Sequence, residues 1–273
     1  MIELLKIEWL KLKNYTAFKV MAIFFTVGVF AINYIVYLVN KNIVKNVPGA
    51  GLISFSPYNF ENTWQSTSYA TGFILLLPSL LLLMLLTNEY TFKTHRQNII
   101  DGLSRQQFIS VKIMMALIFA FISTFLVIIT ALIFGFSTGT SFSLNGIVFV
   151  GYFFLKAVSY NLIAILFSVL VKRTGFAIGV FFIYLGAENI ISQLLNVLSI
   201  KIKAENGKDL GNIGDYLPMN AADGLLAFPD NPIKTMSKNV MPADYIWIVL
   251  PLALLYLALF YFWATKKFVK SDL

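Results

Sequence analysis

The sequence contains no cysteine, and its 273 residues include a single histidine, His95. Without cysteine the chain can form no disulfide and offers no thiolate to a metal or a substrate. One histidine argues against a histidine-based metal centre, and we interpret His95 as a loop or interface residue. We therefore predict that this chain holds no metal, binds no cofactor and has no catalytic residue of its own.

Charged residues are also scarce. They make up 12% of the chain and apolar residues 58%, whereas soluble domains average about 25% and about 45–50%. The composition is that of a membrane protein. The net charge of +8 would suggest nucleic acid in a soluble protein, but here the basic residues lie beside apolar stretches. In that position they set orientation and contact anionic lipid, so we expect a lipid membrane and no nucleic acid as partner.

Two kinds of sequence pattern are missing. No G-x-x-x-x-G-K-[ST] occurs, so the chain lacks the loop that cradles nucleotide phosphates. No internal repeat and no separate soluble domain can be recognised. We predict that residues 1–273 form one transmembrane domain and that the chain is not itself an enzyme.

Six apolar stretches have about the 20 residues that a helix needs to cross a bilayer. They cover residues 18–39, 68–87, 112–136, 147–171, 176–200 and 245–265. The first stretch is too long for a cleaved signal peptide and has no small-residue cleavage site. The predicted fold is an all-α membrane protein with six transmembrane helices.

The distribution of lysine and arginine predicts the orientation. With the N-terminus inside, the short inner segments hold thirteen basic residues and the outer segments seven, among them Lys234 and Lys238. The positive-inside rule then places both termini in the cytoplasm. We expect a multi-pass protein of the cytoplasmic (inner) membrane.

The long segment 201–244 lies on the outer side in this topology. It contains YLPMNAADGLLAFP, residues 216–229, which is apolar but too short to cross the membrane. One interpretation is a re-entrant or interfacial helix. The other is a small cap packed on the outer ends of the spans.

The first seventeen residues predict an interfacial helix. Ile2, Leu5, Trp9 and Leu12 recur at spacings of three and four and so share one helical face. Lysines flank this face, as in amphipathic helices that lie in the membrane surface. The helix is either a topological anchor or an elbow that also braces other helices.

A polar segment with signals for the end of one helix and the start of another follows the second span, at residues 88–111. Its composition predicts a helix from Glu89 that stops at Asp101 and Gly102, because glycine suits the position past a helix end. Ser104 and Gln107 then form a capping-box pattern that starts the next helix. These signals predict a folded element and not a random linker.

Two arginines in this segment favour a protein partner. Arg96 and Arg105 can each donate bidentate hydrogen bonds to carboxylates. The alternative is a solvated loop whose charges only set topology, which explains the charges but not the capping pattern.

Two charges fall inside predicted spans. Lys156 and Glu188 lie at similar depth, roughly 15–18 Å from the outer surface at a rise of 1.5 Å per residue. An unpaired charge there is costly. We predict an ion pair between them, with a role in lining a substrate path as the alternative.

The layout and several motifs resemble the permease subunits of ABC-2-type ABC transporters. The resemblance rests on the opening KIEWLKLKN, on six spans with both ends inside and on NEY…THRQNIIDGLSRQQFISVK after the second span; YLP before the last span is a weaker match. Larger exporters of this family carry a fused ATPase or a large extracellular domain, and this chain has neither. It is thus most similar to short stand-alone permeases of bacterial drug-resistance, immunity and accessory export systems.

The resemblance implies a mechanism and partners. Residues 2–14 would be the elbow helix, and part of residues 89–105 would be the coupling helix that sits in a groove on a separate ATPase subunit. That ATPase would bind ATP and Mg, and a second permease copy would complete the transporter. Transporters of this family usually work as exporters, so the resemblance implies export. The implied coupling residues are Glu89, Arg96, Asp101, Gly102, Ser104 and Arg105.

Two other functions remain open at this point. An ion-gradient-driven secondary transporter would need several ionisable residues at mid-membrane and usually an inverted repeat. A structural membrane subunit of a larger complex would need neither.

Overall fold

The computed structural model describes residues 2–46, 56–230 and 241–271. Within these ranges the ordered secondary structure is helical, with no β-strand. Five helices are long and apolar enough to cross a membrane, and two shorter helices joined by a 43° bend make a sixth candidate if they count as one span. The length and composition of these helices are those of a multi-pass helical membrane protein.

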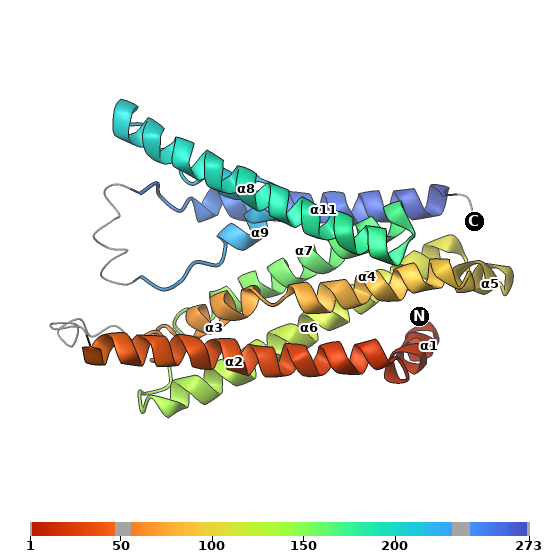
Figure 1. Cartoon of the computed structure of the whole chain (residues 1–273), viewed down its shortest axis with the longest axis horizontal. Helices are drawn as coiled ribbons and strands as arrows, with labels where there is room; N and C mark the ends of the chain where they lie inside the picture. Colours follow the sequence, from red (N-terminus) through yellow and green to blue (C-terminus); the bar gives the residue numbers. More distant parts are fainter. Residues whose placement is uncertain (1, 47–55, 231–240, 272–273) are drawn as a thin grey trace.

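The elements follow one another in a simple up-and-down order. They are α1 (Ile2–Lys13), α2 (Thr16–Asn46), α3 (Thr63–Gly72), α4 (Leu76–Thr91), α5 (Thr94–Ile100), α6 (Arg105–Ser137), α7 (Val148–Val171), α8 (Thr174–Asn206), the 3₁₀ helix η2 (Ile213–Tyr216), α9 (Asn220–Gly224) and α11 (Ile246–Lys270). Helices α1 and α5 and the last turn of α11 lie at one end of the bundle, here called the α1/α5 end (Figure 1).

The long helices contain the predicted apolar stretches but extend beyond several of them. Residues 201–206, expected in an outer loop, form the last turns of α8. The helix stops only at Gly207, whose φ of 66° and hydrogen bond to Lys203 O end it in the left-handed conformation that glycine tolerates. Lys234 and Lys238, which the sequence placed on the outer side, lie outside the described residues.

The predicted span 68–87 is two helices and not one. Helix α3 is rich in serine and threonine, so its apolar signal is weak although most of its residues are buried. It ends in a tight turn in which Phe73 N–H donates to Ala70 O and Ile74 N–H to Thr71 O. The chain then bends by 43° into the leucine-rich α4.

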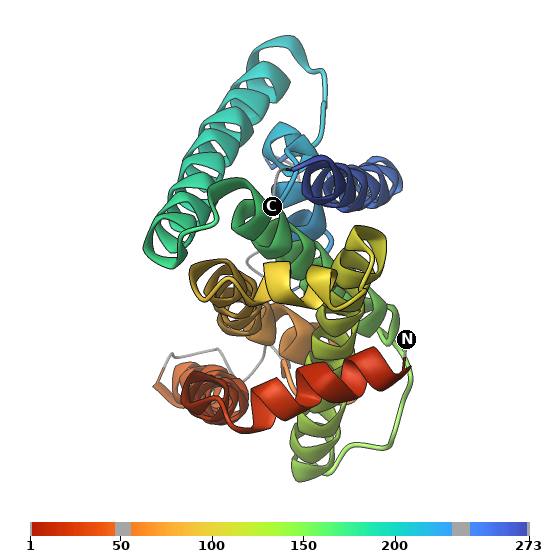
Figure 2. The same cartoon turned by 90° about the vertical axis from the view of Figure 1, so that its right-hand side faces the viewer.

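Helix α7 forms the centre of the bundle. It is the most buried of the candidate spans and contacts α3, α4, α6, α8, α9 and α11. Helices α2 and α8 lie at the periphery and run on opposite sides of it (Figure 2). Both expose many large apolar side chains, which in a membrane face lipid.

Candidate functional site at the α1/α5 end

The helix predicted to run from Glu89 to the stop at Gly102 is broken in two: Glu89 belongs to α4, which ends at Thr91, and α5 begins at Thr94. The chain reverses between them at Lys93, whose φ of 58° is left-handed.

The turn between α4 and α5 is built on the backbone of Glu89. The carbonyl oxygen of Glu89 then accepts hydrogen bonds from His95 Nδ1 at 2.9 Å and from Thr94 Oγ1 at 3.5 Å. His95 is buried, and its ring packs on Tyr90 with 4.6 Å between centroids. His95 thus fixes the direction of α5.

The other end of α5 has the predicted glycine stop, followed by the predicted capping box. Gly102 adopts φ 104°, and Leu103 N–H donates to Asn98 O at 3.0 Å, the six-residue closure of a glycine-terminated helix. Ser104 Oγ accepts from Gln107 N–H, and the Gln107 side chain accepts from Ser104 N–H. The predicted stop and the predicted capping box are both confirmed. Helix α5 is therefore a short, defined helix between two fixed turns.

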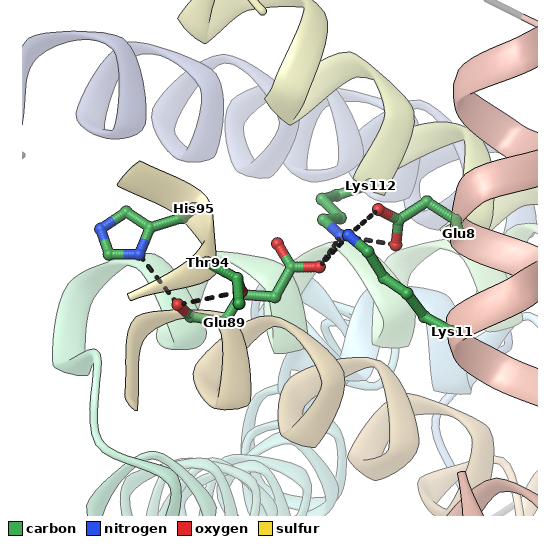
Figure 3. Close-up of polar contacts among 6 residues, drawn as sticks. All are labelled: Glu8, Lys11, Glu89, Thr94, His95 and Lys112. Atoms are coloured by element: carbon green, nitrogen blue, oxygen red, sulfur yellow. Dashed lines mark hydrogen bonds and ion pairs between the residues drawn. The ribbon is translucent and has the colours of Figure 1, made fainter. Parts of the chain in front are cut away.

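A cluster of four charges lies directly behind this element (Figure 3). Lys112 Nζ of α6 lies 2.6 Å from Glu89 Oε1 of α4 and 2.6 Å from Glu8 Oε2 of α1. Lys11 Nζ of α1 lies 2.9 Å from Glu89 Oε1 and 2.8 Å from Glu8 Oε1. We call Glu8, Lys11, Glu89 and Lys112 the charge cluster. It joins α1, α4 and α6 with balanced charge.

The electrostatics of the charge cluster favour the ionised forms of Glu8 and Lys11. Burial opposes ionisation of Glu8, but the ammonium groups of Lys112 and Lys11 outweigh it and hold the pKa of Glu8 below its ordinary value. Burial likewise disfavours the charged Lys11, and the carboxylates of Glu89 and Glu8 outweigh it and raise the Lys11 pKa. The side chains of Glu89 and Lys112 are only 10% and 6% exposed, so each depends on the other for its stability.

This cluster changes the interpretation of two predicted coupling residues. The sequence assigned Glu89 and Arg105 to a protein partner. The structure directs the Glu89 carboxylate inward to Lys11 and Lys112. Arg105 Nη1 donates to the carbonyl oxygens of Val269 and Ser271, at 2.9 Å each, and so holds the end of α11. Partners for both side chains come from within the chain.

The outward surface of α5 is apolar as well as polar. Phe92 before the helix is 74% exposed and Ile100 at its end is 81% exposed. Arg96 and Asp101 are exposed near them. These exposed apolar and charged groups are accessible to a protein partner.

The predicted interfacial anchor is an α-helix across the ends of α2 and α6. Leu12 is buried and Leu5 packs on the core. Trp9 is 55% exposed, and its ring meets Phe18 edge-on at 6.1 Å. The backbone of Ile2 is helical, and its side chain lies outside the described residues.

The two intramembrane charges have different partners from the predicted ones. Lys156 Nζ pairs with Asp223 Oδ1 of α9 at 3.1 Å, and Tyr160 donates to Asp223 Oδ2 at 3.0 Å. Glu188 Oε1 accepts from the backbone N–H of Asn220 at 2.9 Å and also from Met219 N–H. In place of the predicted direct pair, Lys156 and Glu188 each bind a different part of one segment.

The physical reason is the path of that segment, residues 213–226. The sequence analysis left Asp223 in an outer loop. Lys156 comes eight residues after Val148, the first residue of α7, and so lies about 12 Å along this helix at 1.5 Å per residue. Asp223 bonds to Lys156 and therefore lies at the same depth. Gly72 makes room for Lys156 at the end of α3, because a Cβ there would lie 3.0 Å from Lys156 Nζ.

Sequence reasoning missed Glu8, Lys11 and Lys112 as members of the site. Lys112 was assigned only as the first residue of a span. The available signal was the i, i+3 spacing of Glu8 and Lys11 on an otherwise lysine-rich helix. The sequence does not indicate that Glu89, which is 78 residues from Lys11, belongs to the same cluster.

In the comparisons with known proteins, no family model and no curated protein matches the chain. Functional inference therefore rests on the layout, the residues and the geometry of the site.

Proposed function

We propose that this chain is the permease subunit of an ATP-driven ABC transporter of the ABC-2 type, in the cytoplasmic membrane. It has six spans, with α3 and α4 together as the second, and both termini in the cytoplasm. Helix α5 is the coupling helix. It contacts a separate ATPase subunit that binds ATP and Mg, and the transporter works as an exporter.

The observation that carries the proposal is that apolar groups at both ends of α5 are exposed, while α5 is bonded to a helix that the charge cluster holds. Phe92 and Ile100 are exposed. His95 and Thr94 bind the backbone of Glu89, and the charge cluster ties the side chain of Glu89 to α1 and α6. A force applied to α5 by a partner is passed to α4 through these bonds, and from α4 to α1 and α6 through the charge cluster. A loop that only sets topology needs neither feature.

The transporter contains a second permease copy. Helix α8 supports this part of the proposal, because a Cβ at Gly175, Gly179 or Gly186 would meet no heavy atom within 4 Å. Small residues at such spacing let helices approach closely in a membrane. ATP binding then shifts the pair of bundles between two arrangements, because nucleotide favours the closed ATPase dimer.

The experiment replaces the exposed apolar groups of α5. Phe92→Ser and Ile100→Ser leave the charge cluster intact, so the protein should fold and insert normally. We expect less ATPase to co-purify with the tagged permease and less permease-stimulated ATP turnover. Leu144→Ser is the matched control, since Leu144 is 55% exposed in the loop between α6 and α7. Equal co-purification and turnover in the α5 and control variants would contradict the proposal.

A second candidate is a secondary transporter driven by an ion gradient. The observation that favours it is the break between α3 and α4, next to the buried Lys156 and its partner Asp223. Discontinuous helices beside mid-membrane charges are typical of such transporters. Transport by proteoliposomes that needs an ion gradient and no ATPase would select this candidate.

A further inference from the structure

An apolar cavity lies between the interfacial helix α1 and the bundle. Its volume is about 310 Å³. Leu5, Trp9 and Leu12 line it from α1, and Met115 and Ile118 line it from α6. Its walls are apolar except for Lys6, and such a cavity offers water no hydrogen-bond partners.

A second cavity adjoins the first. It has a volume of about 100 Å³, shares Phe18, Phe119 and Ile122 with the first and is lined by α2, α4 and α6, with Phe25 and Pro78 among the lining residues. Phe18 and Phe25 are seven residues apart on α2, about 10 Å along the helix. Together the two cavities form an apolar groove that begins at α1 and runs along α2 and α6.

Two basic residues lie beside the groove. Lys6 lines the cavity with the apolar part of its side chain and is exposed, so its ammonium group can reach the rim. Lys13 is exposed two turns further along the same side of α1. Glu8 and Lys11 point to the other side, where the charge cluster neutralises them. Glu3 is exposed in the first turn of α1 and is not among the lining residues.

We propose that this groove binds one anionic phospholipid, with an acyl chain between α2 and α6 and the phosphate at Lys6. The volumes of about 310 and about 100 Å³ suit an acyl chain and are too small for a helix, which is about 10–12 Å across with its side chains. The charge favours an anionic headgroup, because the exposed Lys6 is the charged residue among those that line the groove. Trp9 lines the cavity and is 55% exposed, as suits a tryptophan in a membrane interface. The occupied groove would complete the packing of α1 on the bundle, opposite the charge cluster.

The test uses the full chain, delipidated in mild detergent and titrated with phosphatidylglycerol or with phosphatidylcholine of the same acyl chains. Native mass spectrometry counts the bound lipids. We expect one phosphatidylglycerol per chain to bind before any other. Lys6→Gln should lower the preference for phosphatidylglycerol over phosphatidylcholine by about fivefold, the factor that corresponds to ~1 kcal/mol per basic residue near an anionic surface. Lys267→Gln, exposed at the end of α11, should leave the preference unchanged.

A second pair of variants tests the groove itself. Ile122→Trp fills it, and Ile133→Trp changes a residue of the same helix that lines neither cavity. Both isoleucines are 52% exposed, so the two variants should fold alike. We expect Ile122→Trp to lose the first bound lipid and Ile133→Trp to keep it. A graded series of lipid adducts that is equal for both headgroups and unchanged in Ile122→Trp would show ordinary annular lipid and overturn the proposal.

Discussion

At the scale of single residues, the charge cluster determines how α1 is attached. Lys112 is shared by Glu8 and Glu89, which come from two other helices. A buried charge that loses its partner is strongly destabilising, whereas removal of both partners costs much less. The contribution of each of these residues to the free energy of unfolding therefore depends on whether the others are present.

The first prediction is a double-mutant cycle at this cluster. Lys112→Met leaves the two carboxylates with Lys11 as their one shared partner, and Glu89→Gln leaves Lys112 with Glu8 alone. Each should cost about 3–5 kcal/mol of unfolding free energy in detergent, the range for a broken buried pair, and the double variant should cost less than the sum. The control is Lys201→Ala, whose pair with Glu205 is more than 60% exposed on both sides and should matter little. Strictly additive costs would show that Glu89 and Lys112 do not interact.

The second prediction concerns Asp215, in η2. Burial is the main cause that raises its pKa to about 7, and the carboxylates of Asp244 and Asp223 raise it further, while Asn212 acts in the opposite sense. The folded chain then binds a proton at Asp215 between about pH 4 and 7 that the unfolded chain does not bind. The stability it contributes should be greatest below about pH 4, fall as the pH rises to about 7, and stay constant above.

The measurement is the thermal unfolding of the parent and of Asp215→Asn at pH 5 and pH 8. The parent should lose more stability than the variant between these two values, by up to about 3 kcal/mol at 1.36 kcal/mol per pKa unit. Asp101→Asn, an exposed carboxylate at the other end, should behave like the parent. A parent and an Asp215→Asn variant with the same pH dependence would show that Asp215 ionises normally.

At the scale of elements, residues 213–226 form one segment that is attached to α7 and α8. Asp223 holds it to α7 through Lys156 and Tyr160, and Glu188 holds it to α8 through the backbone of Met219 and Asn220. Packing adds to these bonds, because a Cβ at Gly214 would overlap the backbone oxygen of Ser192. The segment should be released when its charged bonds are removed.

The third prediction tests this release by cysteine labelling, for which the chain offers a cysteine-free background. A cysteine at Ala222, which is 1% exposed, should react slowly with a membrane-impermeant maleimide. Adding Asp223→Asn should raise the labelling rate on the order of tenfold, the factor for 1.4 kcal/mol of easier opening. A cysteine at Leu210, 42% exposed, should label at the same rate with and without Asp223→Asn. An unchanged rate at position 222 would mean that packing alone holds the segment.

The elements could be predicted from the sequence where local chemistry decides them. Long apolar runs identified the long helices, and Gly102 and Ser104 marked the two sides of one turn. The break after Gly72 could not be predicted, because α3 is stabilised by burial against its neighbours and not by apolar character. The partners of Lys156 and Glu188 were missed for a related reason: they depend on a segment that folds back from a loop, which periodicity does not describe.

At the scale of the whole molecule, the arrangement places three features at one end. The interfacial helix α1, the short helix α5 and the end of α11 lie together there (Figure 1), and Arg105 joins the start of α6 to the end of α11. The sequence predicted that the N-terminus, residues 88–111 and the C-terminus lie on one side of the membrane, and this end of the bundle gathers those parts. The charge cluster connects α1 to α4 and α6 at this end, which the sequence did not reveal.

The central claim is that α5 meets an ATPase subunit in the cytoplasm. The most direct measurement places a photo-crosslinking amino acid at Ile100, which is 81% exposed, in native membranes, with Leu144 in the loop between α6 and α7 as the control position. We predict an adduct at position 100 whose mass-spectrometric peptides include a Walker-motif ATPase, and no such adduct at position 144. An adduct with that ATPase at position 144 and none at position 100, or lipid adducts alone at both, would contradict the account.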